Sequence, residues 1–442
     1  MKGNLCKLLA FCITLFAFIR VAAQDAKLND GSGEYKTKKY RNFFKEYGHS
    51  DKEINDKLEA SFHSLFYGDT AHATAFEAGK NENGPLMYVS DVPHYDIRTE
   101  GMSYGMMICV QMNKKKEFDA IWNYCMTYMY ISDKNHPSEG YFSWHLKRDG
   151  TALDETPAPD GEQWYAMALY FASNRWGDGK GIYNYKYWAD KILTAIRHRE
   201  VKTGDIIAKT GRNAGKPVSY TLGSMINEEH KIIRFVPDVK GGNFTDASYH
   251  LPAFYELFAR WGPKEDRAFW AAAADTSRNF FNKATNPVTG LAPDQSNFDA
   301  TPFDRKFGTR ELKARFSFDS WRTQSNWAVD WMWWHKDPRE QQLSNRILTF
   351  FKSKGMDTYG DQYELNGDAV NTRAGMHHSG GLVATNGASA MAASDPALQK
   401  EFIEALWNME TPHDWVERYY DSLLYLMSML HISGNYRIYA PK

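Results

Sequence analysis

The 442-residue chain contains little cysteine and no excess of either charge. Four cysteines are too few for a disulfide-stabilised scaffold, and none of them has the Cys-x-x-Cys spacing of a zinc site. With 53 basic and 54 acidic residues, the chain lacks the positive charge that would hold a nucleic-acid backbone. Its composition, 43% hydrophobic and 24% charged, also excludes disorder, collagen and coiled coil. We therefore expect a globular protein with no nucleic-acid partner.

The N-terminal residues differ from the rest of the chain. Two lysines precede an almost wholly apolar run over residues 8–19, and the small residues Val21-Ala22-Ala23 follow it. This order is typical of a secretory signal peptide over residues 1–23. The run is too short to span a bilayer, and Phe11 before Cys12 is too bulky for a lipoprotein signal. We expect an exported protein, periplasmic or secreted, without stable membrane association.

Removal of residues 1–23 would change the charge and the cysteine content. Three basic residues and no acidic residue would leave with this segment, so 50 basic and 54 acidic residues would give a formal charge of −4. Cys109 and Cys125 would remain, either as buried thiols or as one disulfide. The polar residues 24–35 predict a flexible segment. No Pro/Gly/Ser-rich linker divides residues 36–442, which we expect to form a single domain.

Long helical patterns dominate this domain, and they occur in pairs. The first helix of each pair is the more apolar, as an inner layer would be, and the second carries more charge. Because the last helix can pair with the N-terminal one, the pattern predicts an all-α ring of six helical hairpins. Short strands are expected in loops, at residues 88–89, 141–144 and 232–236. The predicted helices span residues 50–65, 99–111, 117–130, 161–175, 185–198, 246–261, 265–283, 319–334, 339–352, 380–393, 396–407 and 417–431.

Four acidic residues stand at the same place in four successive hairpins, at the start of the inner helix. They are Glu100, Asp160, Asp246 and Asp319. All inner helices of such a ring point the same way, so the four side chains should share one end of it. Helix capping alone explains an acid at a helix N-terminus. However, each of these acids has Trp, Tyr, Arg or Gly neighbours, a mixture that suits sugar binding, and glycoside hydrolysis needs a pair of carboxyls.

The segments around these acids resemble glycoside hydrolase family 8. The matching segments are RTEGMSYGMM at 98–107, PAPDGE at 157–162 and FDSWR at 318–322. Within that family, the chain is most similar to the reducing-end xylose-releasing exo-oligoxylanases, whose pattern is echoed in SYHLP at 248–252 and GLVATN at 381–386. The resemblance runs from about residue 40 to the C-terminus.

The resemblance implies an (α/α)6 barrel and an inverting hydrolase that releases xylose from the reducing end of xylo-oligosaccharides. By position, it makes Glu100 the general acid and Asp319 the general base. Asp160 would lie at the cleavage subsite, where it orients the sugar and the attacking water. A helix N-terminus lowers the pKa of a carboxyl, whereas a general acid must stay protonated. We therefore expect the negative charge of Asp160 to raise the pKa of Glu100 again. Arg98 would oppose this effect if its side chain pointed inward.

The resemblance also assigns residues to substrate binding. Tyr249 and, on a loop that blocks the far end of the site, His378 would bind the leaving-group sugar. Related enzymes carry Leu-His-Pro in this loop, whereas this chain has His377-His378-Ser379 followed by two glycines, which should loosen it. His378 could equally bind nearby backbone. The full set of expected substrate-binding residues is Arg98, Trp144, Asp246, Tyr249, Trp321, Arg322 and His378.

Two other functions remain open from the sequence. An endo-acting member of the family would cut xylan, β-glucan or chitosan internally, and an exported non-catalytic protein would bind sugars without an acid and base pair. Whether Glu100 and Asp319 face one another separates the last alternative from an enzyme. We expect a monomer without a cofactor. We also expect no metal, because His377 and His378 have no acidic or histidine partner at helical spacing.

Overall fold

The computed structural model describes residues 28–307, 310–370 and 377–442. The expected signal peptide and residues 24–27 lie outside this part of the chain. None of the helices within it has both the length and the apolarity to cross a bilayer. Cys109 and Cys125 are buried free thiols.

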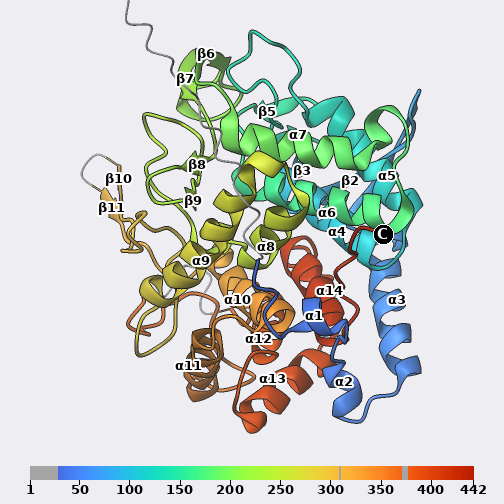
Figure 1. The fold of residues 1–442 in the computed structure, drawn as a ribbon, viewed down its shortest axis with the longest axis vertical. Helices are drawn as coiled ribbons and strands as arrows, with labels where there is room; N and C mark the ends of the chain where they lie inside the picture. Colours follow the sequence, from blue (N-terminus) through green and yellow to red (C-terminus); the bar gives the residue numbers. More distant parts are fainter. Residues whose placement is uncertain (1–27, 308–309, 371–376) are drawn as a thin grey trace, which may run out of the picture.

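Twelve helices of the described chain form a double-layered ring (Figure 1). The inner layer consists of α4 (Thr99–Gln111), α6 (Pro159–Trp176), α8 (Pro252–Trp261), α10 (Trp321–Trp334), α12 (Gly380–Ala390) and α14 (Tyr420–Ile432). The outer layer consists of α5 (Lys115–Tyr124), α7 (Tyr185–His198), α9 (Arg267–Ala284), α11 (Arg339–Ser353), α13 (Pro396–Asn408) and α3 (Asp51–Tyr67). Neighbouring inner helices contact one another around the ring, α6 and α8 through the rings of Trp164 and Phe254. The predicted (α/α)6 barrel is confirmed.

Hydrophobic patterning decides which helix lies inside. Every residue of α12 is buried, and so is every residue of α4 except Glu100, whose side chain is still only 17% exposed. The outer helix α3 instead buries one face and begins at a capping box formed by Ser50 and Glu53. Figure 1 shows the first helices, in blue, beside the last ones, in red. The two ends of the chain therefore close the ring, as the pairing of the last helix predicts.

The strands are more extensive than the sequence predicts. An antiparallel sheet orders β1 (Ala75–Asn81), β2 (Gly84–Asp91), β3 (Asp96–Arg98), β4 (His145–Lys147) and β5 (Ala152–Asp154) next to one another in chain order. Three two-stranded pairs follow: β6 (Lys202–Ile207) with β7 (Pro217–Leu222), β8 (Ile226–Asn227) with β9 (Ile232–Ile233), and β10 (Arg305–Phe307) with β11 (Arg310–Leu312). Residues 141–144 form only an isolated bridge at Phe142, so the strand predicted there is wrong; β4 begins at His145.

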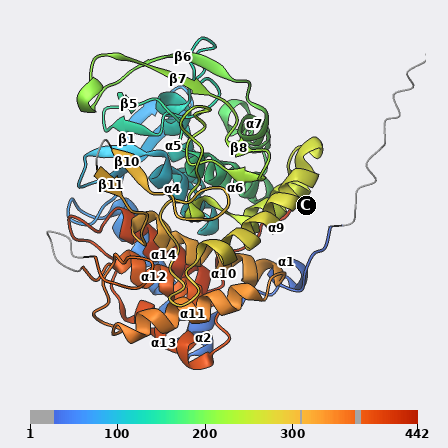
Figure 2. The ribbon, with the colours of Figure 1, turned by 90° about the vertical axis from the view of Figure 1, so that its left-hand side faces the viewer.

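Three inner helices, α8, α10 and α14, begin later than predicted. Asp246 and Asp319 lie not on α8 and α10 but on 3-10 turns ahead of them, Ala247–Tyr249 with Asp246 as its cap and Phe318–Ser320. We call the N-terminal ends of the inner helices, with the segments that lead into them, the mouth of the ring. Figure 2 shows β1, β5, β10 and β11 toward one side of the molecule and α1 (Glu34–Thr37) toward the other.

The segment ahead of α1 is packed, although its composition predicts flexibility. The backbone N–H groups of Ser32 and Gly33 both donate to the carbonyl oxygen of Trp334, over 3.1 and 3.3 Å. Asp30 forms an ion pair with Arg260 at 2.7 Å. The orphan carbonyls at the C-terminal end of a helix need such donors, so this part of residues 24–35 is held against α10.

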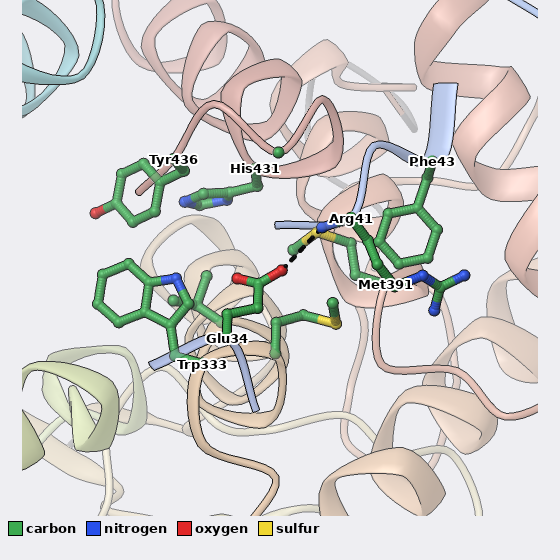
Figure 3. A pocket seen from close by; sticks show the side chains of 10 residues that line it. Glu34, Arg41, Phe43, Trp333, Met391, His431 and Tyr436 are labelled. Carbon is green, nitrogen blue, oxygen red and sulfur yellow. Dashed lines mark hydrogen bonds between the residues drawn. The ribbon is translucent and has the colours of Figure 1, made fainter. Parts of the chain in front are cut away.

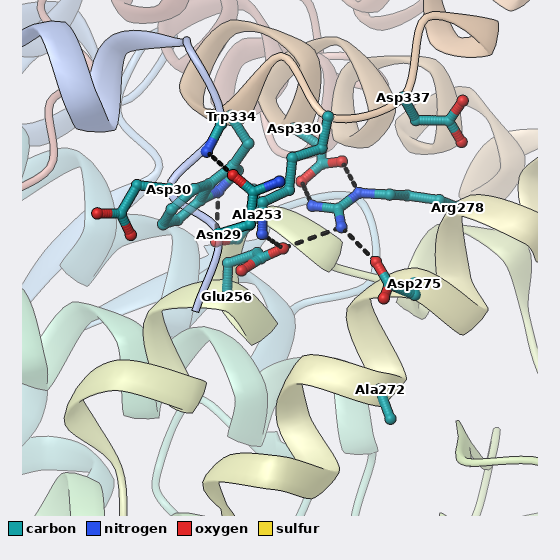
Figure 4. Close-up of polar contacts among 12 residues, drawn as sticks. Asn29, Asp30, Ala253, Glu256, Ala272, Asp275, Arg278, Asp330, Trp334 and Asp337 are labelled. Carbon is teal, nitrogen blue, oxygen red and sulfur yellow. Dashed lines mark hydrogen bonds and ion pairs between the residues drawn. The ribbon is translucent and has the colours of Figure 1, made fainter. Parts of the chain in front are cut away.

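A buried ion-pair cluster ties three helices together beside this segment (Figure 4). Arg278 of α9 donates to both carboxylate oxygens of Asp330 on α10, over 2.7 and 2.9 Å, and to Glu256 on α8 at 2.9 Å. All three side chains are almost fully buried. Because a buried charge without a partner is very costly, this cluster fixes the relative positions of the three helices.

Glu34 lies in a second buried cluster at the same end of the ring (Figure 3). Its Oε1 accepts a hydrogen bond from the backbone N–H of Arg41 at 3.2 Å, and it lines a small cavity of about 10 Å³ with His431 and Tyr436. Burial raises the pKa of Glu34 from its usual 4.5 to about 8. Folded Glu34 therefore keeps its proton at a pH where the unfolded chain has lost it.

This raised pKa predicts a cost in stability at neutral pH. Between pH 4.5 and 8 the unfolded state alone releases the Glu34 proton, so the free energy of unfolding should fall as pH rises. Glu34→Gln cannot ionise, so its free energy of unfolding should not show this fall. The difference in free energy of unfolding between the variant and wild type should therefore be a few kcal/mol larger at pH 8 than at pH 4.5, because each pKa unit corresponds to about 1.4 kcal/mol. Urea unfolding at both pH values measures the difference, with exposed Glu46→Gln as control. An equal pH dependence in wild type and Glu34→Gln contradicts the assignment.

Candidate active site

One guanidinium group joins three of the four predicted carboxylates. Arg322, on the first turn of α10, is buried at the mouth. Its Nη1 donates to Glu100 Oε2 at 2.9 Å and to Asp160 Oδ2 at 3.2 Å. Its Nη2 lies 3.0 Å from Asp319 Oδ1. Glu100 and Asp319 therefore lie on the two terminal nitrogens of one planar group, which brings both carboxylates to the same site.

The ring of helices produces this convergence. Glu100 and Asp160 lie on the first turns of α4 and α6, and Asp319 lies on the turn directly ahead of α10. Since these inner helices point the same way, their N-terminal side chains meet at the mouth. The N-terminal dipoles also favour carboxylates there. The sequence-based prediction that these three acids share one site is in agreement with this geometry.

Two tyrosines and a serine complete the contacts, and sequence reasoning missed all three as site residues. Tyr419 donates from its hydroxyl to Glu100 Oε1 at 3.1 Å. Arg322 donates from Nη1 to the Tyr104 hydroxyl at 2.7 Å and from Nη2 to Ser248 Oγ at 3.0 Å. Tyr104 lies one helical turn after Glu100, so the spacing that places Glu100 at the mouth would also have indicated Tyr104.

The Glu100 and Asp319 carboxyls lie in different environments. Burial raises the pKa of Glu100 from 4.5 to about 7; the charges of Asp319 and Asp160 add to this rise, and Arg322 opposes it. Burial also raises the pKa of Asp160. The Asp319 side chain, by contrast, is 37% exposed. Repulsion by Asp160, which the sequence suggested as the cause at Glu100, is therefore secondary to burial.

Asp246 does not touch the guanidinium of Arg322. It is fully buried, and its Oδ1 accepts a hydrogen bond from the backbone N–H of Ser248 at 2.7 Å. Burial and the charge of Asp319 raise the pKa of Asp246 well above its usual value. Asp246 thus supports the turn that carries Ser248 and Tyr249. The Tyr249 ring lies beside Arg322, with 5.8 Å between the ring centroid and the guanidinium carbon.

Arg98 and Trp144 lie at the edge of this cluster. The Arg98 guanidinium pairs with Asp91 at 2.8 Å and with Asp96 at 3.2 Å, so its closest carboxylates are not those of the site. The Trp144 ring is half-buried and stacks on His145 at 4.5 Å. Its carbonyl oxygen accepts from the backbone N–H of Thr99 at 3.0 Å, which places Trp144 next to the start of α4.

Trp321 does not present a ring face for a sugar, contrary to its sequence-based assignment. Its side chain is buried, and its Nε1 donates to the carbonyl oxygen of Asp361 at 2.9 Å. The neighbouring Phe318 has the exposed ring instead, with 53% exposure and a φ of 40°. A bulky residue seldom adopts this left-handed region. The turn that carries Asp319 thus holds Phe318 in an unusual conformation, with its ring outward.

His378 lies at the N-terminal end of α12 but contacts none of the three carboxylates. Its Nδ1 lies 2.8 Å from the carbonyl oxygen of Tyr359, and its ring packs edge-on against that of Tyr359. Residues 371–376, the first part of the expected blocking loop, lie outside the described chain. His377 forms an ion pair with Glu417 at 2.5 Å. Across the described residues, no group of three or more His, Cys, Asp or Glu side chains could hold a metal ion.

Comparisons with known proteins agree on one family. The profile of Glycosyl hydrolases family 8 matches residues 82–227 and 235–434. The reducing-end xylose-releasing exo-oligoxylanase Rex8A of Paenibacillus barcinonensis is 42% identical, over 92% of this chain and 99% of its own length. Its structure with xylose has a TM-score of 0.80 at 40% identity, covering 92% of this chain and all of the other. A GH8 xylobiose complex from Teredinibacter turnerae has a TM-score of 0.86 at 47% identity with the same coverage, and a catalytic mutant of a xylanase from that organism was solved with xylohexaose.

Proposed function

Because the chain belongs to glycosyl hydrolases family 8, we propose that it hydrolyses xylo-oligosaccharides with inversion and releases xylose from their reducing end. The observation that carries the chemistry is the placement of Glu100 and Asp319 on opposite nitrogens of Arg322. A non-catalytic sugar-binding protein has no need of two carboxyls held at one site. Membership of the family agrees with this geometry, and the chain is a glycoside hydrolase.

Glu100 is the proposed general acid. A pKa of about 7 leaves much of it protonated at neutral pH, so it can donate its proton to the leaving glycosidic oxygen. Asp319, which is partly exposed, is the proposed general base that takes a proton from the attacking water. Inverting enzymes keep the two carboxyls about 6.5–9.5 Å apart, and an intervening guanidinium is compatible with such a gap.

Arg322 and Asp160 are proposed to orient these groups. Arg322 bonds to all three carboxylates, so its planar fork fixes their relative directions. Asp160 also accepts from the backbone N–H of Gly161 at 2.8 Å, which holds its second oxygen. Asp160 is therefore preorganised to bind a sugar hydroxyl or the attacking water at the cleavage subsite.

The raised pKa of Glu100 predicts the pH dependence of the reaction. The acid must be protonated to act, so kcat/KM should fall as pH rises through about 7, by about tenfold per pH unit above it. Initial rates on xylotriose between pH 5 and 9 measure this limb. A rate that stays constant up to pH 9 contradicts a general acid with this pKa.

Exo action at the reducing end is supported by the names of the relatives and by Tyr249 at the site. A site that binds the free anomeric hydroxyl should reject a chain in which that hydroxyl is blocked. The test compares xylotetraose with xylotetraose tagged at its reducing end. We expect release of xylose from the free sugar and little cleavage of the tagged one. Equal internal cleavage of both contradicts the exo assignment.

Endo cleavage is the second candidate, favoured by the loop at His378. The sequence His377-His378-Ser379 replaces the family's Leu-His-Pro, and His378 is bonded to the Tyr359 backbone. The xylanase from Teredinibacter turnerae, 46% identical, was crystallised with xylohexaose. If this chain cuts xylohexaose internally, xylobiose and xylotriose will be among the first products.

We also propose that the protein is exported as a monomer after cleavage following Ala23. The support is the order of basic, apolar and small residues over residues 1–23. Mass spectrometry of the secreted chain tests for an N-terminus at Gln24, and gel filtration tests for a monomer.

A further inference from the structure

Two exposed aromatic rings stand together at the mouth, apart from the carboxylates. Tyr95 lies in the turn between β2 and β3, and Trp415 lies in the segment ahead of α14. Tyr95 is 59% exposed and Trp415 is 49% exposed. Their ring centroids are 5.5 Å apart, with 57° between the ring planes. Paired exposed aromatic rings are costly to leave in water and mark binding surfaces.

Both rings belong to the segments that hold Glu100. Tyr95 precedes Glu100 by five residues of extended chain, which span at most about 18 Å. Trp415 precedes Tyr419 by four residues, and the Tyr419 hydroxyl donates to Glu100 Oε1 at 3.1 Å. The pair is therefore continuous with the active site through two separate routes, at a distance that an oligosaccharide of several units can reach.

The fold supports each ring from behind. The Arg148 guanidinium carbon lies 4.8 Å from the Tyr95 ring centroid, and Arg148 Nε donates to Ser90 Oγ at 2.8 Å. The Arg418 guanidinium carbon lies 5.5 Å from the Trp415 centroid, and Arg418 itself is buried. These cation–π contacts support both rings, while about half of each side chain remains exposed.

The backbone at Tyr95 adopts an unfavourable conformation. Tyr95 has a φ of 55°, in the left-handed region that a bulky residue seldom adopts. Such strain persists where the surrounding structure enforces it, and it gathers at functional sites.

We propose that Tyr95 and Trp415 form a platform for a distal xylose unit of a longer xylo-oligosaccharide. This inference rests on the proposed function, because the xylo-oligosaccharide assigned to the platform is the substrate proposed there. The apolar C–H face of a pyranose stacks on a flat aromatic ring, and the large aromatic area supplies the affinity. The platform makes binding depend on chain length: a long chain reaches both the carboxylates and the platform, whereas a short chain reaches only the carboxylates.

Calorimetric titration of the Glu100→Gln protein tests this platform without hydrolysis. Trp415→Ala and Tyr95→Ala, each in that background, should weaken binding of xylohexaose by about fivefold or more and leave xylotriose binding unchanged. Trp415→Phe should restore most of the loss. The matched control is Tyr187→Ala. This substitution removes an aromatic side chain of 53% exposure on α7, near the end of the helical barrel opposite the mouth.

The outcomes separate the platform from the proposed function. Equal effects on xylotriose and xylohexaose, or no effect on either, overturn the platform. If the wild-type protein hydrolyses neither sugar, the proposed function fails, while the calorimetric comparison still decides the platform. If the Glu100→Gln protein does not bind xylohexaose at all, the platform fails, while hydrolysis by the wild-type protein still decides the proposed function. Unchanged melting temperatures in the surface variants show that the folded protein is being compared.

Discussion

Glu100→Gln is expected to lower kcat on xylotriose by about 10³-fold or more, because the leaving oxygen then departs without a proton. The amide keeps the size of the carboxyl: its oxygen can still accept a hydrogen bond from Arg322, and its NH2 group can donate to the Tyr419 hydroxyl. We therefore expect KM and the melting temperature to change little. Steady-state kinetics and differential scanning calorimetry on purified protein measure the two effects separately.

The pH profile of the variant provides the control for this assignment. The residual rate of Glu100→Gln should no longer fall as pH rises through about 7, since the group that titrates there has been removed. Near-normal turnover of xylotriose, or a residual rate that keeps the same basic limb, contradicts Glu100 as the acid.

Asp319→Asn is the second large effect, with a loss of about 10²-fold to 10⁴-fold in kcat. An amide cannot take the proton from the attacking water, although it can still accept from Arg322 Nη2. Because Asp319 is partly exposed and lies on a short turn, its replacement should cost little stability. Rates on xylotriose and the melting temperature check both statements.

A neighbouring acid offers a matched control for Asp319. Asp294 is half-buried behind the same turn, where its Oδ2 accepts from Ser317 Oγ at 3.3 Å and its Oδ1 from the backbone N–H of Arg315 at 3.1 Å. Asp294→Asn should disturb this support and lower the melting temperature more than Asp319→Asn does, with a smaller loss of rate. The reverse order of the two effects would assign Asp319 to structure and not to chemistry.

The ring itself could be predicted because its signal is local. Apolar residues at helical spacing, broken by Gly, Pro and Asn, predicted helices over residues 99–111 and 185–198, and α4 and α7 span these residues. Acids at the starts of successive inner helices then had to share one end. The three carboxylates at Arg322 follow from this arrangement.

The parts that could not be predicted depend on contacts between distant residues. Arg322 was expected to bind substrate, but its bond to Glu100 joins residues 222 positions apart, which no local pattern reveals. Burial, the main cause of the raised pKa of Glu100, is likewise a property of the packed ring. Of the sheet from β1 to β5, only residues 88–89 of β2 were predicted as a strand; β1 was missed because it alternates only weakly between buried and exposed residues.

Trp321 shows a third kind of limit. Its place at the start of α10 was correct, but the direction of its side chain depends on the rotation of the helix about its axis. That rotation buries Trp321 against Asp361, whereas Phe318, with its exposed ring, lies on the turn ahead of the helix. Residue type and spacing therefore located the site, and side-chain direction had to come from the structure.

The most direct measurement is proton NMR of the anomeric signals in the first minutes of xylotriose hydrolysis. The central claim is that Glu100 and Asp319 act as acid and base on opposite sides of the bond, so water attacks from the face opposite the leaving group. The new reducing end, on xylobiose, should then appear first as the α-anomer and reach equilibrium with the β-anomer by mutarotation. A new reducing end that appears first as the β-anomer would contradict this account and require a retaining mechanism.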